Sequence, residues 1–190
     1  MITPLQMQKI KDYSKKMRWT INEGYWNHTT EVVKHSINLQ KKFGGKKDII
    51  EAAAWLHDIG KNKGRNKLED MSKEKHQIVS SEMADKFMKE INISDEEIRK
   101  VCDAILQSHS TNDYPANKEQ SIIACADKMA VLTDNDEARR WHGKNLSKED
   151  KLLITNTLKD IFLHIKNSPF PSAAEYVQEQ YVKKLEKYKA

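Results

Sequence analysis

Apolar residues recur along most of the chain at spacings of three and four, which is the period of an amphipathic α-helix. No segment shows the sustained alternation of apolar and polar residues that is typical of a β-strand. The pattern predicts about eight helices, over residues 5–19, 28–43, 47–59, 73–91, 95–109, 118–132, 148–166 and 173–188. We therefore expect an all-α fold, built as a helical bundle.

Residues that start or stop helices separate these segments. Ser94, Ser147 and Ser172 each stand three residues before an acidic residue, which is the pattern of a helix N-cap. The glycine pair 44–45 is expected to end the second helix, and the prolines of segment 168–171 break the chain before the last one. Because the chain contains no internal repeat or linker, residues 1–190 are expected to form a single domain.

The chain is basic, with a formal net charge of +5. Lysines alternate with glutamates over most of its length, so the charge indicates a solvated surface, and a nucleic-acid partner is not expected. No stretch approaches the roughly 18 apolar residues of a membrane span, and the N-terminus lacks the apolar run of a signal peptide. These features predict a cytoplasmic protein. Cys102 and Cys125 lie in apolar helical patterns and are interpreted as small core residues.

The second predicted helix carries histidine on its apolar face. His28, Val32, His35, Leu39 and Phe43 follow one another at steps of four, three, four and four, so they share one side of the helix. His28 and His35 are about 10 Å apart along the axis and can hardly bind one ion. We interpret His35 as a structural histidine of the core.

Four further segments place an acid or an imidazole on an apolar face. The stretch "AAAWLHDIGK" puts His57 and Asp58 at the end of a buried helix, and Asp127 stands among small residues in "ACADKMAVL". His76 and His109 lie at the ends of two other apolar faces. Because the apolar faces of one small domain meet in one core, these side chains are expected to converge.

A buried carboxylate is costly unless something pairs with it, and metal coordination is the usual way to keep it ionised. Histidine and aspartate without thiolate suit divalent Mn, Fe, Co, Ni or Zn. The sequence therefore predicts a site for transition-metal ions with this candidate ligand set: His28, His57, Asp58, His76, His109 and Asp127.

The ordered set of His28, the His57–Asp58 pair and Asp127 resembles the HD-domain metal-dependent phosphohydrolase superfamily. The stretches "HTTEVV", "AAAWLHDIGK" and "ACADKMAVL" carry the resemblance, which covers residues 26–132. It implies a single helical HD domain in which these four side chains hold one metal ion.

A subset of the superfamily holds two ions, bridged by the aspartate of the His-Asp pair, and adds two histidines between that pair and the last aspartate. His76 and His109 lie in that interval, so the chain resembles the two-metal subset. The alternative is that these two histidines merely line the cleft, which leaves one ion. Ser110 follows His109 and no Gly-Tyr-Pro element comes after it, unlike the cyclic-dinucleotide phosphodiesterase branch.

The resemblance implies hydrolysis of a phosphate ester or anhydride, with a nucleotide or another small phosphorylated metabolite as the substrate. Asp58 would be a catalytic residue that positions a metal-activated hydroxide. Lys61 is expected beside the site, where it serves catalysis and binds the substrate phosphate. Arg65 and Arg140 are further candidates for substrate binding. Trp141 is either a stacking platform for a base or a core anchor.

Two other functions stay open at this point. Some HD-fold enzymes with the six-ligand set are di-iron oxygenases, and a fold of this kind also serves as a non-catalytic nucleotide-binding or signalling module. Lys128 follows Asp127 directly, but it lies about 100° further around the helix and is expected to point to solvent.

Overall fold

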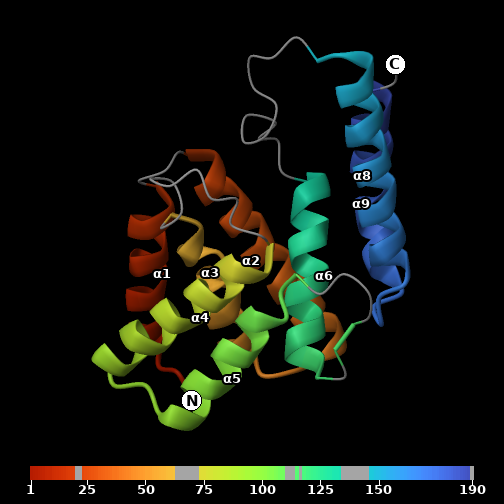
Figure 1. Ribbon diagram of the computed structural model, residues 1–190. Helices are drawn as coiled ribbons and strands as arrows, with labels where there is room; N and C mark the ends of the chain where they lie inside the picture. Colours follow the sequence, from red (N-terminus) through yellow and green to blue (C-terminus); the bar gives the residue numbers. More distant parts are fainter. Residues whose placement is uncertain (20–22, 63–72, 110–113, 116, 134–145, 189–190) are drawn as a thin grey trace.

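The computed structural model describes residues 1–190 except 20–22, 63–72, 110–113, 116, 134–145 and 189–190. The described residues contain no strand, so the prediction of an all-α fold is confirmed. None of their helices has the length and apolar character that crossing a membrane requires. The helices of Figure 1 are α1 (Pro4–Trp19), α2 (Glu23–Phe43), α3 (Lys47–Leu56), the short 3₁₀ helix η1 (Ile59–Asn62), α4 (Lys73–Glu90), α5 (Asp95–Leu106), α6 (Lys118–Thr133), α8 (Lys148–Lys166) and α9 (Ser172–Lys187).

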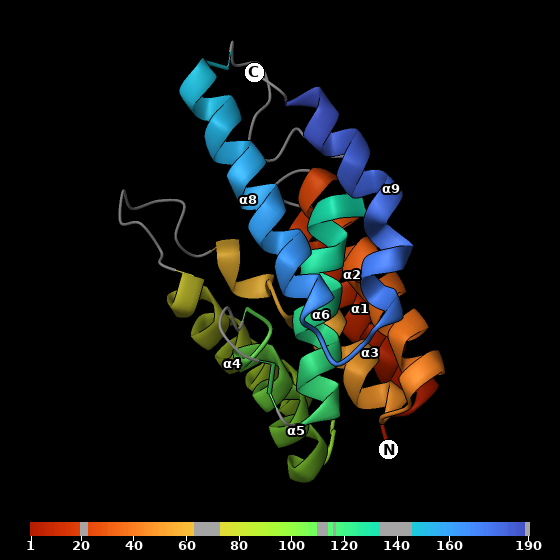
Figure 2. The ribbon, with the colours of Figure 1, turned by 90° about the vertical axis from the view of Figure 1, so that its right-hand side faces the viewer.

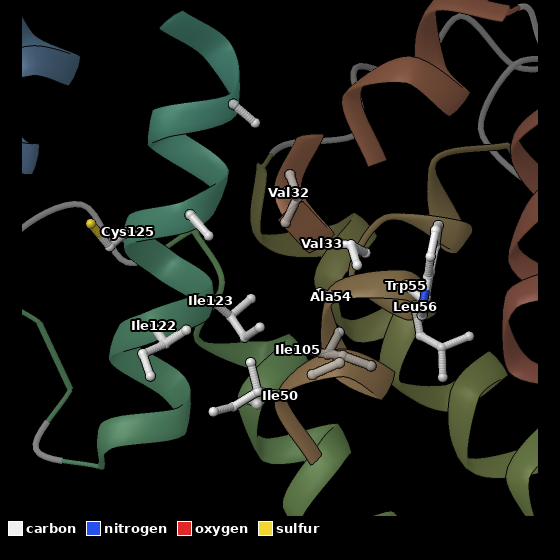
Figure 3. Close-up of a cluster of buried hydrophobic side chains, with 14 of the residues drawn as sticks. Val32, Val33, Ile50, Ala54, Trp55, Leu56, Ile105, Ile122, Ile123 and Cys125 are labelled. Carbon is white, nitrogen blue, oxygen red and sulfur yellow. The ribbon is translucent and has the colours of Figure 1, made fainter. Parts of the chain in front are cut away.

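Helix α3 lies at the centre of the bundle and is buried over most of its surface. It packs against α1, α2, α5 and α6. Three successive alanines, 52–54, are fully buried and let neighbouring helices approach closely. Figure 3 shows Ala54 and Leu56 among branched side chains such as Val33 and Ile105. Because the helix is enclosed, the residues that follow its C-terminal end enter the protein interior rather than solvent.

Two helices end three residues earlier than the sequence pattern predicts. The predicted helix 47–59 ends at Leu56, because the chain turns at His57 and Asp58 and continues as η1. The predicted helix 95–109 ends at Leu106. Ser108 accounts for this second end, since both its backbone N–H and its hydroxyl donate to the carbonyl of Ile105. A side chain that competes for the last carbonyls of a helix favours its termination.

Two of the three predicted N-cap serines cap their helices and the third does not. Ser94 and Ser147 each accept a hydrogen bond from the backbone N–H three residues later, as predicted. The prediction for Ser172 is wrong: this serine is the first residue of α9, and Pro171 precedes it without a side-chain cap. The glycines that follow α2 adopt positive φ values of 82° and 100°, which is the conformation expected at that helix end.

The C-terminal helices α8 and α9 form an antiparallel pair that lies along α6 (Figures 1 and 2). Apolar residues at helical spacing bury one side of this pair, among them Ile154, Leu158 and Ile165 of α8. Val177 makes the corresponding buried contact from α9. The pair therefore covers the side of α6 that faces away from α3.

Candidate metal centre

Asp58 lies at the point where the predicted ligands meet. It is 1% exposed, and its two carboxylate oxygens face three histidines from three segments of the chain. The Nε2 atoms of His76 and His109 lie 3.5 Å and 3.3 Å from Asp58 Oδ1, and His57 Nε2 lies 3.4 Å from Oδ2. The enclosed end of α3 brings this carboxylate into the interior, as the sequence pattern indicates.

Asp127 faces Asp58 from helix α6. Its Oδ1 lies 3.0 Å from Nε2 of His28, and its Oδ2 lies 3.1 Å from Nδ1 of His109. His57 Nε2 is a further 3.7 Å neighbour of Oδ1. The structure thus brings together all six side chains of the predicted set.

Two groups of these side chains have the geometry to hold an ion. In the first, ligand atoms of His28, His57 and Asp58 all lie within 4.8 Å of one another. In the second, the same holds for Asp58, His76 and His109. Asp58 belongs to both groups, so one carboxylate is common to both candidate positions for an ion.

Two of the histidines, His57 and His76, present an unpaired nitrogen atom to this centre. His57 Nε2 and His76 Nε2 are buried and have no hydrogen-bond partner among the described residues. On the other side of the His57 ring, Nδ1 donates to the carbonyl of Ala54 at 2.8 Å. Because a carbonyl only accepts, this bond keeps the proton on Nδ1 and leaves the Nε2 lone pair directed at the centre. The donor set and its orientation fit a divalent transition metal.

Both aspartates are held as carboxylates. Burial acts to raise the pKa of Asp58, but Lys61, His57 and His109 outweigh it and hold that pKa well below its usual value. Burial likewise acts to raise the pKa of Asp127, and Lys128 with His109 holds it well below its usual value. The two acids therefore stay ionised at neutral pH, as metal ligands must.

The pKa values of His76 and His109 shift in opposite directions. Burial, together with the charge of Lys61, lowers the pKa of His76 to about 4. His76 is therefore neutral at pH 7 and keeps a lone pair for coordination. Burial also acts to lower the pKa of His109, but Asp127 and Asp58 outweigh it and raise that pKa from its usual value.

Three cationic side chains surround the aspartates. Lys61 Nζ lies 2.6 Å from Asp58 Oδ2, and the catalytic and substrate-binding roles expected of this lysine stay predictions. Lys128 Nζ lies 3.2 Å from Asp127 Oδ2, and its side chain is 15% exposed. The expectation that Lys128 points to solvent is wrong, because its long side chain folds back along α6 to the carboxylate.

Arg18 of α1 is a contact of the centre that the sequence analysis missed. Its guanidinium is fully buried, with Nη1 donating to the Asp58 carbonyl at 2.8 Å and Nη2 lying 3.4 Å from Asp58 Oδ2. The signal was present: Ile10, Ser14 and Arg18 follow at steps of four and are all fully buried. An arginine on the buried face of a helix needs an acidic partner, and that requirement pointed to the site.

Gly60 sets the distance between η1 and α4. Its N–H donates to Ser80 Oγ at 2.9 Å, and a Cβ atom at this position would lie 2.6 Å from Ser80 N and 2.8 Å from the His76 carbonyl. A side chain here would push η1 away from the helix that carries His76. The glycine therefore allows η1, which follows Asp58, to lie close to α4, which carries His76.

The remaining predicted residues lie elsewhere. Arg65, Arg140 and Trp141 fall outside the described residues. His35 is fully buried and its Nε2 lies 2.7 Å from Thr133 Oγ1, which confirms its interpretation as a structural histidine. Cys125 is fully buried, as predicted for a core residue, whereas Cys102 is only half-buried.

Comparison with known protein families matches residues 25–132 to the HD domain. The chain belongs to the HD domain family. The matched segment begins before His28 and ends after Asp127, and the resemblance inferred from the three sequence stretches is confirmed. HD domains bind divalent metal ions, and their family is one of metal-dependent hydrolases. The same comparisons find no match for the chain among curated proteins or solved structures.

Proposed function

We propose that this HD domain protein hydrolyses a phosphate ester or anhydride with two divalent transition-metal ions. The observation that carries the proposal is the place of Asp58, which belongs both to the His28–His57 group and to the His76–His109 group. A carboxylate shared in this way supports a pair of ions better than a single one. The ligands of the two ions would be the four histidines and two aspartates of the candidate set.

Phosphate chemistry follows from the charges of the site. When bound, divalent ions lower the pKa of water and polarise phosphoryl oxygens, which supplies a nucleophile at neutral pH. Two divalent ions outweigh the charges of Asp58 and Asp127, and Lys61 and Lys128 add to the excess of positive charge. Such a centre attracts an anionic phosphoryl group.

We assign the following roles to the residues of the chain. Asp58 is the shared ligand that positions the attacking water. Arg18 fixes the orientation of the Asp58 carboxylate. Lys61 has its ammonium group at the edge of the centre, where it binds a phosphoryl oxygen of the substrate. Arg65 and Arg140 stay predicted contacts of the substrate phosphate.

A nucleotide is the proposed substrate class, by analogy with other HD domains. The analogy concerns the family and not a feature of the site, so a substrate screen has to include small phosphorylated metabolites as well.

The test begins with the metal content of the purified full chain, followed by reconstitution with Mn, Fe, Co, Ni or Zn. Phosphate release is then measured over nucleotides and small phosphorylated metabolites. His28→Gln and His57→Ala are expected to abolish release. His35→Gln is the matched control, because His35 lies on the same helix face as His28 and outside the centre, and it is expected to retain activity.

Two results would contradict the proposal. Hydrolysis by His57→Ala at the wild-type rate would show that the assigned site is not the reactive one. Tightly held iron, oxygen consumption with an organic substrate and no phosphate release would assign the protein to the di-iron oxygenases instead.

A further inference from the structure

A cavity with a volume of about 930 Å³ lies apart from the metal centre, between α1, α3 and α5. Its walls come from segments 1–11, 46–55 and 94–100. None of the six candidate metal ligands is among the described residues that line it. Because cavities that bind small organic molecules have volumes of roughly 300–1,000 Å³, the size of this one suits such a ligand.

One wall of the cavity is apolar. Buried Ile2, Ile49 and Trp55 line it together with half-buried Met7. The Trp55 ring stacks on the ring of Trp26, with centroids 5.4 Å apart, so its orientation is fixed. Apolar side chains of this kind provide the contact surface for the apolar body of a ligand.

Three of the four acids that line the cavity are already engaged with other groups of the chain. Asp48 Oδ2 accepts a hydrogen bond at 2.9 Å from a backbone N–H of the N-terminal segment. Glu96 forms an ion pair with Lys100, and Glu97 forms one with the N-terminal ammonium group. Glu51 is the lining acid that makes no ion pair within the described parts of the chain.

Most lysines of the cavity keep their charge available. Lys11, Lys46 and Lys47 are exposed, and none of them makes an ion pair with a described residue. Lys11 Nζ lies 5.6 Å from the centroid of the Trp55 ring, which places its ammonium group at the apolar wall. Three unpaired cations therefore stand against the one unpaired carboxylate of Glu51, and the cavity offers an excess of positive charge to a ligand.

We propose that this cavity is a binding site for a small organic anion that carries an apolar body. The apolar wall contacts the body, and Lys46 and Lys47 attract the anionic group from the side of α3. Charge complementarity selects an anion over a neutral molecule of the same shape. The site does not rest on the proposed function, since it uses no residue of the metal centre and requires no turnover.

A naphthalenesulfonate combines an apolar bicyclic body with one anionic group, and it serves as the probe. Calorimetry measures its binding to the zinc-loaded full chain. Methanesulfonate lacks the apolar body, and the corresponding naphthol is uncharged at pH 7. We expect each of these two compounds to bind about tenfold more weakly than the probe.

Replacing charges of opposite sign should change the affinity in opposite directions. Lys46→Gln combined with Lys47→Gln removes two of the unpaired cations and is expected to weaken binding of the probe about tenfold. Glu51→Gln removes the unpaired carboxylate and is expected to strengthen binding about threefold. Lys41→Gln combined with Lys42→Gln is the matched control, because it changes the net charge equally at exposed lysines outside the cavity, and it should bind like the wild type.

His57→Ala distinguishes the cavity from the metal centre, and we expect it to bind the probe with the wild-type affinity. Loss of binding in this variant would place the probe at the metal ions and overturn the site. Wild-type affinity in the Lys46 and Lys47 double variant would also overturn it, as would weaker binding by Glu51→Gln. A wild-type chain that binds the probe no better than methanesulfonate would have the same consequence.

Discussion

Arg18 and Asp58 form a fully buried pair that joins helix α1 to the metal centre, with Nη1 2.8 Å from the Asp58 carbonyl oxygen and Nη2 3.4 Å from Oδ2. The guanidinium is further oriented by Thr29, whose hydroxyl oxygen lies 3.3 Å from Nε. Arg18 therefore fixes both the backbone and the carboxylate of the residue that the two candidate metal groups share. Its planar fork suits this double contact better than a lysine would.

We expect Arg18→Met to destabilise the protein by about 3–5 kcal/mol, because it leaves the buried Asp58 carboxylate without its arginine. Denaturant unfolding of the metal-free protein measures this loss. Lys16→Met is the control: Lys16 is exposed on the same helix, and its replacement is expected to change stability by no more than about 0.5 kcal/mol. Equal stability of the two variants would show that the pair contributes nothing.

The shared position of Asp58 predicts a specific pattern of metal loss. Asp58→Asn removes the ligand common to both groups, so we expect the metal content to fall from two ions per chain to near zero. His76→Gln removes a ligand of one group and is expected to leave one ion. Elemental analysis after dialysis against a weak chelator measures both. Retention of two ions by Asp58→Asn would contradict the bridging role.

Gly60→Ala is expected to destabilise the protein by about 1–3 kcal/mol, because the new methyl group meets backbone atoms of α4. The displacement should loosen the ion of the His76–His109 group more than that of the His28–His57 group. Ser80→Ala is the matched comparison, since it removes the Gly60 hydrogen bond without a clash, and it should have the smaller effect. Thermal unfolding and metal titration distinguish the two variants.

His35 predicts an acid-dependent loss of stability. Burial lowers its pKa to about 4, despite the opposing effect of Glu31, whereas in the unfolded chain the value is near 6.5. Glu31, Lys34, Thr133 and Tyr176 surround the ring. As the pH falls below 6.5 the unfolded chain takes up a proton that the folded protein does not, so stability decreases until pH 4.

The size of this decrease is about 3 kcal/mol for a fully buried histidine shifted this far. Urea unfolding at pH 7, 5.5 and 4.5 measures it. His35→Gln lacks the titrating group and is expected to lose less stability than the wild type over this range. Parallel curves for the two proteins would mean that His35 does not contribute.

Much of the centre could be predicted because its residues interrupt otherwise apolar helix faces. His57 and Asp58 follow a helix so apolar that its end had to lie inside the protein, and Asp127 stands among alanines that admit a close neighbour. Periodicity identifies which face of a helix is buried, and a buried acid or imidazole implies a partner.

The missed residues have a different physical origin. Lys128 reaches Asp127 through a long side chain, and its direction cannot be predicted from the angular position of its Cα atom. Helix α5 ends early because the Ser108 hydroxyl competes for the carbonyl of Ile105. A serine can make the same hydrogen bond within a helix, so its presence alone does not predict a helix end. Arg18 was overlooked because α1 lies outside the family resemblance, although its burial follows the helical period.

The location of Arg18, before the first residue of the HD domain match, bears on how such proteins are divided into functional units. The family match, residues 25–132, includes all the candidate histidines and aspartates but excludes Arg18, whose guanidinium orients Asp58. A shortened protein limited to residues 25–132 would keep every candidate ligand but lack the arginine that orients Asp58.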